Sequence, residues 1–329
     1  MRLLVLGGTV YLSKTVAAHA VARGHDVTVA TRGKTGEAPD GVTRLTIDRS
    51  TPEGLEPLRG KTFDAVVDVT RFPDQVQNTL EALAGNVGHW TFVSTCSVYN
   101  DDATPGQTPA TALTHEPTPD DSGDPAMELF GPSKVSCENQ IRDRLGDKAF
   151  IVRPGLIVGP GDRGDRFGYW PRRIAEGGEM LAPGDSSENI QYIDVRDLAD
   201  WILDAAENGT TGTYDAICPP ISRGAFLDQI ATALDADVTF TWVPQDLLTE
   251  HEVAPWMGEQ SLGLWLPLPE YAGFMNRDVT ASVAAGMKIR PLGETALAWR
   301  DAAGPDPALR AGITREKESE ILAAFHKNA

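Results

Sequence analysis

The sequence predicts an α/β protein built on a doubly wound parallel sheet, and two observations lead to this prediction. Residues 1–34 contain a short apolar run, a glycine turn at Gly7-Gly8, a stretch with apolar residues at helical spacing, and a second apolar run from Asp26 to Ala30. A strand, a turn, a helix and a strand within about thirty residues form one βαβ unit. Further apolar runs alternate with helical stretches, which is the pattern of a parallel sheet.

The alternation continues as far as residue 153. We expect strands at Gly41 to Asp48, Phe63 to Val69, His89 to Ser94 and Ala149 to Arg153, and helices at Pro52 to Leu58, Asp74 to Ala84 and Glu128 to Arg144. Residues 101–127 are rich in Asp, Pro and Thr and show no periodicity, so they predict a long surface loop. The first 155 residues therefore form most of a Rossmann-like sheet domain.

The order is less regular in the second half of the chain. We expect a strand and a helix within Gln191–Ala206, and helices at Ala225–Leu234 and Thr314–His326. We assign residues 156–329 mainly to a smaller C-terminal lobe, with segments around 190–215 returning to the core of the sheet domain.

Composition narrows the class of protein. The 329 residues are 41% hydrophobic and 23% charged, as in globular proteins, and the net charge of −18 argues against nucleic acid or an anionic membrane as the main partner. No apolar run approaches the roughly 18 residues of a membrane span, and the opening run is too short for a secretory leader. Three widely spaced cysteines imply no disulfide framework, and six histidines show no metal-ligand spacing. We predict a cytoplasmic protein without a metal site.

The glycine turn after the first strand is the first candidate binding site, because the N–H groups at a helix N-terminus attract anions. Gly7 and Gly8 stand at the front of a dinucleotide fingerprint, whereas Val10 and Ser13 occupy its later glycine positions. The turn alone fits either a nucleotide site or an ordinary βα turn. Ligands of such sheets lie beyond the carboxyl ends of the strands. Four neighbours are assigned to the same cofactor site: Thr9, Tyr11, Leu12 and Val69.

Residues after the second and third strands bear on the kind of nucleotide. An acidic residue after the second strand would accept hydrogen bonds from the ribose of NAD, whereas this chain has Arg32 and Lys34 there. Because a guanidinium matches phosphate geometry, the pair predicts NADP, with NAD the less favoured cofactor. The alternative is that both are solvated loop charges. Asp48 and Arg49 follow the third strand, where Asp48 is placed to accept from an adenine amino group or to cap the turn.

Three later motifs carry a family resemblance: VSTCSVYN (93–100), ELFGPSKVSCE (128–138) and VRPGLIVGPGDR with QYIDVRDLADWI (152–202). Together with GGTVYL at the front, they resemble the extended, epimerase/dehydratase-type short-chain dehydrogenase/reductase family in order and approximate spacing. The resemblance covers about residues 1–210. It implies a Rossmann domain with a smaller C-terminal substrate lobe, a bound nicotinamide dinucleotide and, often, a homodimer.

Carried over by resemblance, the catalytic residues are only partly present. Thr95 matches the family's Ser or Thr, and Lys134 matches the lysine of its Tyr-x-x-x-Lys motif, which holds the nicotinamide ribose and lowers the tyrosine's pKa. The tyrosine position is Phe130. Phenylalanine cannot exchange a proton, and a general acid or base typically contributes roughly 10²–10⁴-fold in rate. The sequence does not choose among the possible replacements: Thr95 through water, Cys96, Tyr99, Tyr169 and Tyr192.

Other matches concern the substrate. Cys96 and Ser97 stand where sugar-nucleotide dehydratases of the family have Asp and Glu, which disfavours a 4,6-dehydratase. The resemblance places Arg153-Pro154-Gly155 beside the nicotinamide. It places Arg166, Arg172 and Arg173 where relatives bind the anionic part of a substrate, and we add Tyr169 to this set. Without the relatives, the three arginines would be surface charges and Tyr169 a packed lobe residue.

These observations support two main hypotheses. The first is an NADP(H)-dependent oxidoreductase or epimerase that acts on a hydroxyl or ketone of a small, sugar- or nucleotide-like substrate, with an atypical acid/base. The second is a catalytically degenerate protein of the same fold that binds a dinucleotide and regulates a partner. A third reading, RNA binding, is disfavoured by the net charge of −18.

Overall fold

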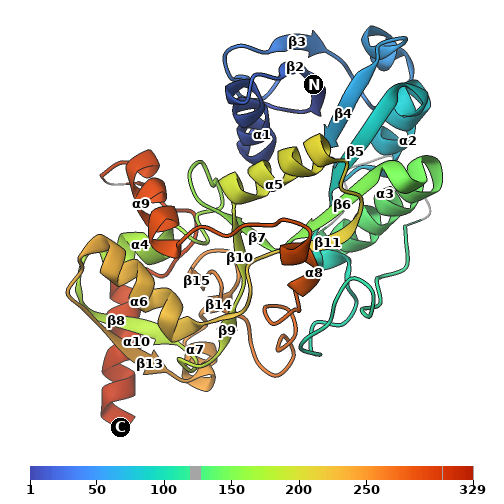
Figure 1. The fold of residues 1–329 in the computed structure, drawn as a ribbon. Helices are drawn as coiled ribbons and strands as arrows, with labels where there is room; N and C mark the ends of the chain where they lie inside the picture. The colour runs from blue at the N-terminus through green and yellow to red at the C-terminus, as the bar shows by residue number, and fades with distance from the viewer. Residues whose placement is uncertain (119–126, 306, 329) are drawn as a thin grey trace.

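The computed structural model describes residues 1–118, 127–305 and 307–328. Its centre is a seven-stranded sheet in the order β11-β6-β5-β4-β1-β2-β3 (Figure 1). All neighbouring strands are parallel. The strands are β1 Arg2–Leu6, β2 Asp26–Thr31, β3 Thr43–Thr46, β4 Phe63–Asp68, β5 Val87–Val93, β6 Ala149–Pro154 and β11 Gly212–Ala216. The predicted doubly wound, Rossmann-like α/β fold is therefore confirmed.

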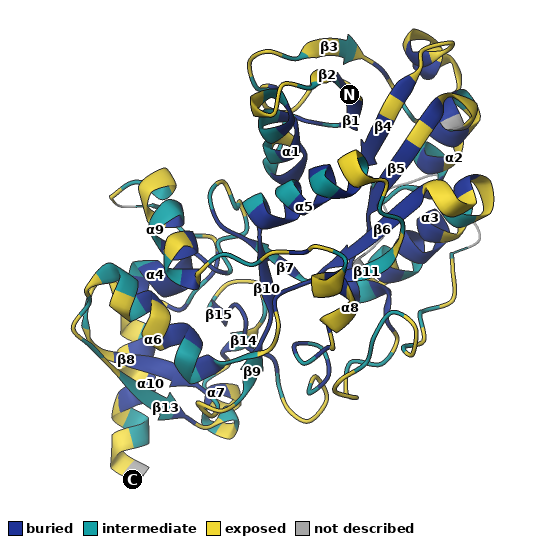
Figure 2. Cartoon of the chain, in the orientation of Figure 1, coloured by how far each residue is buried: buried dark blue, intermediate teal, exposed yellow. Residues whose placement is uncertain are grey.

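Helices cover both faces of this sheet. One face packs against α1 (Tyr11–Ala22) and α5 (Val195–Asn208), and the other against α2 (Pro73–Leu83) and α3 (Phe130–Leu145). Alternate residues of β1 explain the two layers, since Leu3 and Val5 lie in the core with α1 while Leu4 and Leu6 lie in the core with α2. Burial on both faces accounts for the continuous apolar runs of the sequence (Figure 2).

A smaller lobe follows in the second half of the chain. Its pair of parallel strands, β8 (Gly178–Pro183) and β13 (Val238–Val243), packs with α4 (Tyr169–Ile174), α6 (Arg223–Leu234), α7 (Gln245–Glu250), α9 (Leu292–Ala303) and α10 (Arg315–Asn328). Trp170, Trp265 and Phe226 are fully buried in its core, so part of the tryptophan-rich sequence serves packing.

Short elements complete the chain. The two-stranded pairs are β7 Leu156–Val158 with β10 Tyr192–Asp194, β9 Asn189–Ile190 with β12 Ile221–Ser222, and β14 Ala254–Pro255 with β15 Ser261–Leu262. Helix α8 spans Thr280–Ala284, and 3₁₀ turns lie at Glu53–Leu58, Ala84–Asn86, Cys96–Val98, Met127–Leu129 and Gly146–Lys148. No helix among the described residues is long and apolar enough to cross a bilayer.

Two sequence expectations are corrected here. The helix expected at Pro52 to Leu58 is a 3₁₀ turn that contains Pro57, whose ring and missing N–H are incompatible with an α-helical interior. The strand expected at Gly41 to Asp48 is confined to Thr43–Thr46. The predicted loop 101–127 is irregular where described, with a bridge from Tyr99 to Thr114, and its residues 119–126 lie outside the described residues. The division of the chain at residue 155 stays a prediction.

Candidate functional site

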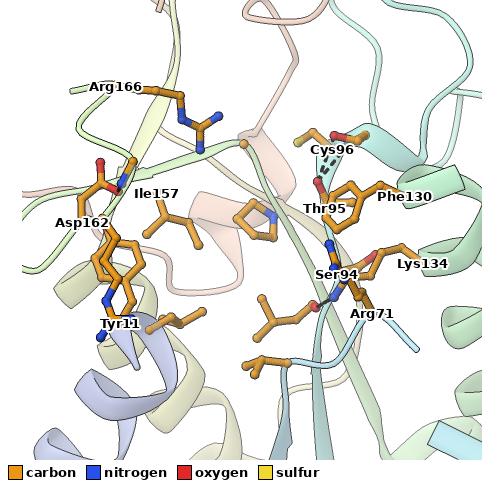
Figure 3. A pocket seen from close by; sticks show the side chains of 18 of the residues that line it. Tyr11, Arg71, Ser94, Thr95, Cys96, Phe130, Lys134, Ile157, Asp162 and Arg166 are labelled. Atoms are coloured by element: carbon orange, nitrogen blue, oxygen red, sulfur yellow. Dashed lines mark hydrogen bonds between the residues drawn. The ribbon is translucent and has the colours of Figure 1, made fainter. Parts of the chain in front are cut away.

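A cavity of about 610 Å³ lies beyond the carboxyl ends of the central strands, where the sheet meets the smaller lobe. Thr95, Phe130 and Lys134 line one side, and Tyr11, Asp162 and Arg166 line the other, with Ile157 between them (Figure 3). Residues of this cavity that the sequence assigned to the site are Tyr11, Leu12, Val69, Thr95, Cys96, Phe130, Lys134, Pro154, Gly155 and Arg166. The topology thus gathers residues from distant parts of the sequence at one sheet edge.

A second hollow of about 200 Å³ lies at the same edge, on the other side of the glycine turn. Its lining includes Gly7, Thr9, Arg32, Lys34, Asp48 and Arg49. Val69 borders both hollows. The sheet order reverses at β1, which pairs with β2 on one side and β4 on the other. The two hollows therefore follow the crevice in which doubly wound sheets bind nucleotides.

The turn between β1 and α1 keeps the backbone of an anion site. Gly7 and Gly8 have φ of 110° and 89°, and a Cβ on Gly8 would lie 2.7 Å from a methyl carbon of Val29. Val10, in place of a family glycine, is extended with φ −137° and gives no side-chain cap within the described structure. The first-turn residues of α1 include no acid. The Gly7 N–H donates to the backbone oxygen of Ala30 at 2.9 Å, so an anion such as a pyrophosphate would meet the N–H groups that follow it at the start of α1.

The side chain at the last glycine position of the fingerprint, Ser13, lies beside the turn and lines the cavity. The hydroxyl of Ser13 donates to the backbone oxygen of Val10 at 2.9 Å, and the residue is 5% exposed. The Ser13 hydroxyl is therefore already hydrogen-bonded within the first turn of α1. Val10 contributes to the cavity wall.

Lys134 is buried at the floor of the cavity. Its Nζ donates to the backbone oxygens of Thr70, at 2.7 Å, and Val93, at 2.6 Å, and it lies 4.7 Å from the ring centroid of Phe92. Burial lowers the pKa of Lys134 to about 8. Helix α3 thus holds an ammonium at the end of β5 whose charge is easily lost when the pH rises.

Thr95 and Phe130 lie together on the same wall (Figure 3). The hydroxyl of Thr95 accepts from the N–H of Ser97 at 3.1 Å and donates to the Ser97 hydroxyl at 3.2 Å. Phe130 is one helical turn before Lys134 on α3, so the two side chains lie on the same face of the helix, as the sequence predicted. This wall can position a substrate oxygen but holds no phenol to exchange a proton with it.

The three tyrosines that were considered as replacements for the family's catalytic tyrosine do not line the cavity. Tyr99 is 2% exposed, donates to Asp215 Oδ1 at 2.6 Å and accepts from Arg153 Nη1 at 3.0 Å. Tyr169 and Tyr192 are 4% exposed in the core of the smaller lobe. The three hydroxyls are therefore separated from the cavity by packing, and these expectations are corrected.

Cys96 borders the cavity, but its chemistry is that of a buried thiol. The residue is 2% exposed, and its Sγ donates to the backbone oxygen of Arg153 at 3.1 Å. Burial raises the pKa of the Cys96 thiol well above its ordinary value, so a thiolate is disfavoured. The structure gives no support for Cys96 as the proton-exchanging group.

Three arginines predicted to bind ligands are held elsewhere. Arg153 forms a buried two-point ion pair with Glu138, at 2.9 and 2.6 Å, beneath the cavity floor. Arg173 is 2% exposed and pairs with Glu318 at 2.7 Å. Arg172 pairs with Glu176 and, like Tyr169, is not part of the cavity lining. The predicted ligand roles of Arg153, Tyr169, Arg172 and Arg173 are corrected, because packing and carboxylates of this chain occupy their side chains.

Arg49 lies in the smaller hollow, but its guanidinium already has partners. It donates to both carboxylate oxygens of Asp68, at 2.8 and 2.6 Å, and to the hydroxyl of Thr79 at 2.9 Å. Arg32 and Lys34 are exposed at the rim of the same hollow, near Asp48. Hydrogen bonds from Ser50, aided by both cations, lower the pKa of Asp48. A ligand would thus meet Arg32 and Lys34 rather than the paired Arg49.

Sequence reasoning missed several cavity residues: Asp162, Arg163, Trp256, Met257 and Phe274. Arg71, two residues after the strand expected at Phe63 to Val69, also lines the cavity. Asp162 stands in the GPGDR turn of a recognised family motif, so a search for polar residues in that turn would have found it. Trp256 and Phe274 come from the irregular, Trp- and Pro-rich region, which carries no periodic signal.

The two hollows lie where doubly wound sheets bind dinucleotides. The model of the NAD dependent epimerase/dehydratase family matches residues 3–216, and the chain belongs to this family. The recognition made from the sequence motifs is confirmed, and family membership supports a nicotinamide dinucleotide as the cofactor.

Solved structures show the same fold. UDP-glucose 4-epimerase from Thermotoga maritima, determined with UDP-glucose, is 16% identical, with a TM-score of 0.64 over 92% of this chain and 100% of that one. UDP-N-acetylglucosamine 4-epimerase from Bacillus cereus is 17% identical, with a TM-score of 0.62 over 91% and 99%. RMD from Pseudomonas aeruginosa, complexed with NADPH, is 17% identical, with a TM-score of 0.58 over 92% and 99%. At such identities the likeness carries the fold alone.

A search of curated proteins found a local match. Residues of this chain are 30% identical over 105 residues to orotidine 5′-phosphate decarboxylase from Pyrococcus horikoshii, covering 32% of this chain. The chain spans about half of that protein, 48% of its length. A match of this extent transfers no activity.

Proposed function

We propose that the protein is an NADP(H)-dependent oxidoreductase or epimerase that acts on a hydroxyl or ketone of a small, sugar- or nucleotide-like substrate. The observation that carries this proposal is the pair of hollows on either side of an uncapped glycine turn. Arg32 and Lys34 border one, and Thr95 and Lys134 border the other. When bound, the nicotinamide would donate or accept a hydride at the larger hollow.

The residues of this chain have separate roles in the proposal. The turn at Gly7 to Val10 binds the pyrophosphate, while Arg32 and Lys34 hold a 2′-phosphate and thereby favour NADP over NAD. We assign Lys134 to the nicotinamide ribose, and Thr95 to the reacting oxygen, to which its hydroxyl would donate in place of its present bond to the Ser97 hydroxyl. Trp256 and Phe274 supply apolar surface that excludes water from the substrate.

The 2′-phosphate assignment is tested by titrating the protein with NADPH and NADH and following nicotinamide fluorescence. We expect the double variant Arg32→Ala/Lys34→Ala to bind NADPH about tenfold or more weakly, because two charge-assisted contacts are lost, while NADH binding changes less than about twofold. Lys61→Ala, which removes an exposed cation outside both hollows, is the control. Equal weakening of both cofactors would contradict the NADP preference, and no binding of either would contradict the proposed function.

A second function is favoured by one observation, the phenyl ring of Phe130 where the family has its phenol. A dinucleotide-binding regulatory protein without catalysis would bind NADPH but would exchange no hydride with any ketone. We further propose a small-molecule substrate, a homodimer and a cytoplasmic location, as the family resemblance implies. Light scattering on the purified protein tests the homodimer.

A further inference from the structure

Two polar atoms in the wall opposite Phe130 lack partners. The hydroxyl of Tyr11 and Oδ2 of Asp162 are buried, and neither has a hydrogen-bond partner in the part of the chain that the structure describes. Both residues line the large cavity, together with Arg166 (Figure 3). Because buried polar atoms in proteins are nearly always hydrogen-bonded, these two indicate a ligand that completes the wall.

The backbone fixes the Asp162 carboxyl with one oxygen free. Its Oδ1 accepts from the N–H of Gly164 at 2.8 Å, and the Asp162 N–H donates to the oxygen of Gly159 at 3.3 Å. Gly159 and Gly161 have φ of 108° and 82°, which turns the chain tightly before Asp162. The loop thus holds the carboxyl in place and leaves Oδ2 for a ligand.

The position of Tyr11 is also unusual. Its φ of 40° is left-handed, which costs a bulky residue on the order of 1 kcal/mol or more. Tyr11, the first residue of α1, adopts this left-handed conformation directly after the extended Val10. Strain of this kind persists where the surrounding structure holds it, and it is found often at functional sites.

Charged neighbours set the behaviour of the two groups. Burial raises the pKa of Asp162, the hydrogen bond from the Gly164 N–H and the charge of Arg166 oppose it, and the charge of Asp165 adds to it. Burial, Asp162 and Asp194 of β10 raise the pKa of Tyr11, again opposed by Arg166. Asp194 itself is held by Arg196 and Thr295. The phenol therefore stays protonated and donates, while the carboxyl exchanges its proton at a higher pH than an ordinary aspartate.

We propose that Asp162 replaces the family's tyrosine as the proton-exchanging catalytic residue, with Tyr11 donating a hydrogen bond to the same substrate oxygen. The inference rests on the proposed function. In the oxidation direction, the substrate hydroxyl gives its proton to Asp162 Oδ2, and the electron pair of the adjacent C–H bond leaves as hydride to the oxidised nicotinamide, so that the C–O bond becomes a carbonyl. In reduction, the carbonyl carbon gains the hydride and its oxygen takes the proton back from Asp162. Solvent restores the carboxyl.

A first experiment needs no turnover. Infrared difference spectra are recorded over a pH titration of the complexes with NADP⁺ and with NADPH. The carboxyl signal that is absent from the Asp162→Asn variant is assigned to Asp162. The two complexes differ at the ring by one positive charge, so we expect the pKa of Asp162 to be lower with NADP⁺. The same pKa in both complexes would overturn the inference while leaving cofactor binding intact. Failure of either dinucleotide to bind would overturn the proposed function and this inference with it.

A second experiment follows NADPH oxidation with 9,10-phenanthrenequinone as a carbonyl probe. We expect Asp162→Asn to lower kcat roughly 10²-fold and to remove the pH dependence assigned to this carboxyl, and Tyr11→Phe to lower it less. Asp228→Asn, which removes an exposed carboxylate of α6 outside the cavity lining, is the control and should retain wild-type kcat. Unchanged kcat and pH profile in Asp162→Asn would overturn the inference alone. If the wild-type protein binds NADPH but does not reduce the quinone, the proposal that the protein is an enzyme is contradicted.

Discussion

Phe130 is the residue on which the proposed chemistry of the site depends, because it is predicted to stand at the position of the family's tyrosine. It lies one helical turn before Lys134, beside Thr95, in a cavity whose opposite wall carries Asp162 and Tyr11. The sequence could show that the phenol was missing, because the motif around it is intact. It could not locate a replacement, since the distance between the two walls depends on how the GPGDR turn folds over the start of α1.

The Phe130→Tyr variant tests whether the site has a relocated acid or is a decayed one. If Asp162 performs the proton exchange, a restored phenol should change the rate of NADPH oxidation only modestly, by less than about tenfold, and shift the pH profile. The measurement is kcat against pH with a quinone probe. A gain of roughly 10²-fold or more would show that the missing phenol limits the reaction, which contradicts a working replacement.

Lys134 gives a pH dependence with a definite sign. Burial lowers its pKa to about 8, so the ammonium present at pH 7 is largely neutral at pH 9.5. We expect NADPH to bind several-fold more weakly at pH 9.5, since roughly 1 kcal/mol of attraction to the anionic dinucleotide is lost. Isothermal titration at both values measures it. Lys134→Met should bind more weakly at pH 7 and show no such change with pH; the same change in this variant would assign it to another group.

The sequence predicted the helices and strands whose hydrophobic pattern is strong, including the strands that are buried on both faces of the sheet. The runs that became β1, β2, β4, β5 and β6 were recognised as strands, because strands buried on both faces are continuously apolar. The edge strand β11 was not, since its sequence Gly-Thr-Tyr-Asp-Ala shows no apolar run. The short pairs β7–β10 and β9–β12 depend on contacts between segments far apart in the chain, and such contacts leave no local signal.

The β1–α1 turn allows a matched test of its backbone. Gly8→Ala should destabilise the protein by roughly 2–4 kcal/mol, because the new Cβ combines a left-handed φ of 89° with a 2.7 Å approach to Val29. Gly24→Ala, with φ of 80° and no atom within 4 Å of its Cβ, should cost only about 1 kcal/mol. Urea unfolding gives both values. Equal losses would show that the turn is less tightly packed against β2 than described.

At the scale of the molecule, a buried ion pair ties the last helix to the smaller lobe. Glu318 of α10 accepts from Arg173 at 2.7 Å and from the N–H of Leu181 in β8 at 2.9 Å. We expect Glu318→Ala to lower the free energy of unfolding by about 3–5 kcal/mol, because Arg173 would remain buried and unpaired. Glu316→Ala, on the exposed face of the same helix, should change it by less than about 0.5 kcal/mol. If both variants changed the free energy of unfolding by a similarly small amount, α10 would contribute little to the stability of the smaller lobe.

The same pair explains one limit of sequence reasoning. Arg173 and Glu318 are separated by 145 positions, so nothing in the local sequence marks Arg173 as a structural residue rather than a substrate ligand. Arg32, in contrast, follows a recognisable strand directly, and its place at the rim of the crevice follows from the sheet order alone. For Arg173, a long-range ion pair rather than residue type decides that the side chain is structural.

A crystal structure of the protein with NADP⁺ tests the central claim, a phosphorylated nicotinamide dinucleotide in the crevice, most directly. We predict the pyrophosphate over Gly7 to Val10 at the N-terminus of α1, the 2′-phosphate against Arg32 and Lys34, and the nicotinamide in the cavity between Lys134 and Asp162. A crevice closed by the Val10 side chain, with Arg32 in contact with no ligand at saturating NADP⁺, would contradict it.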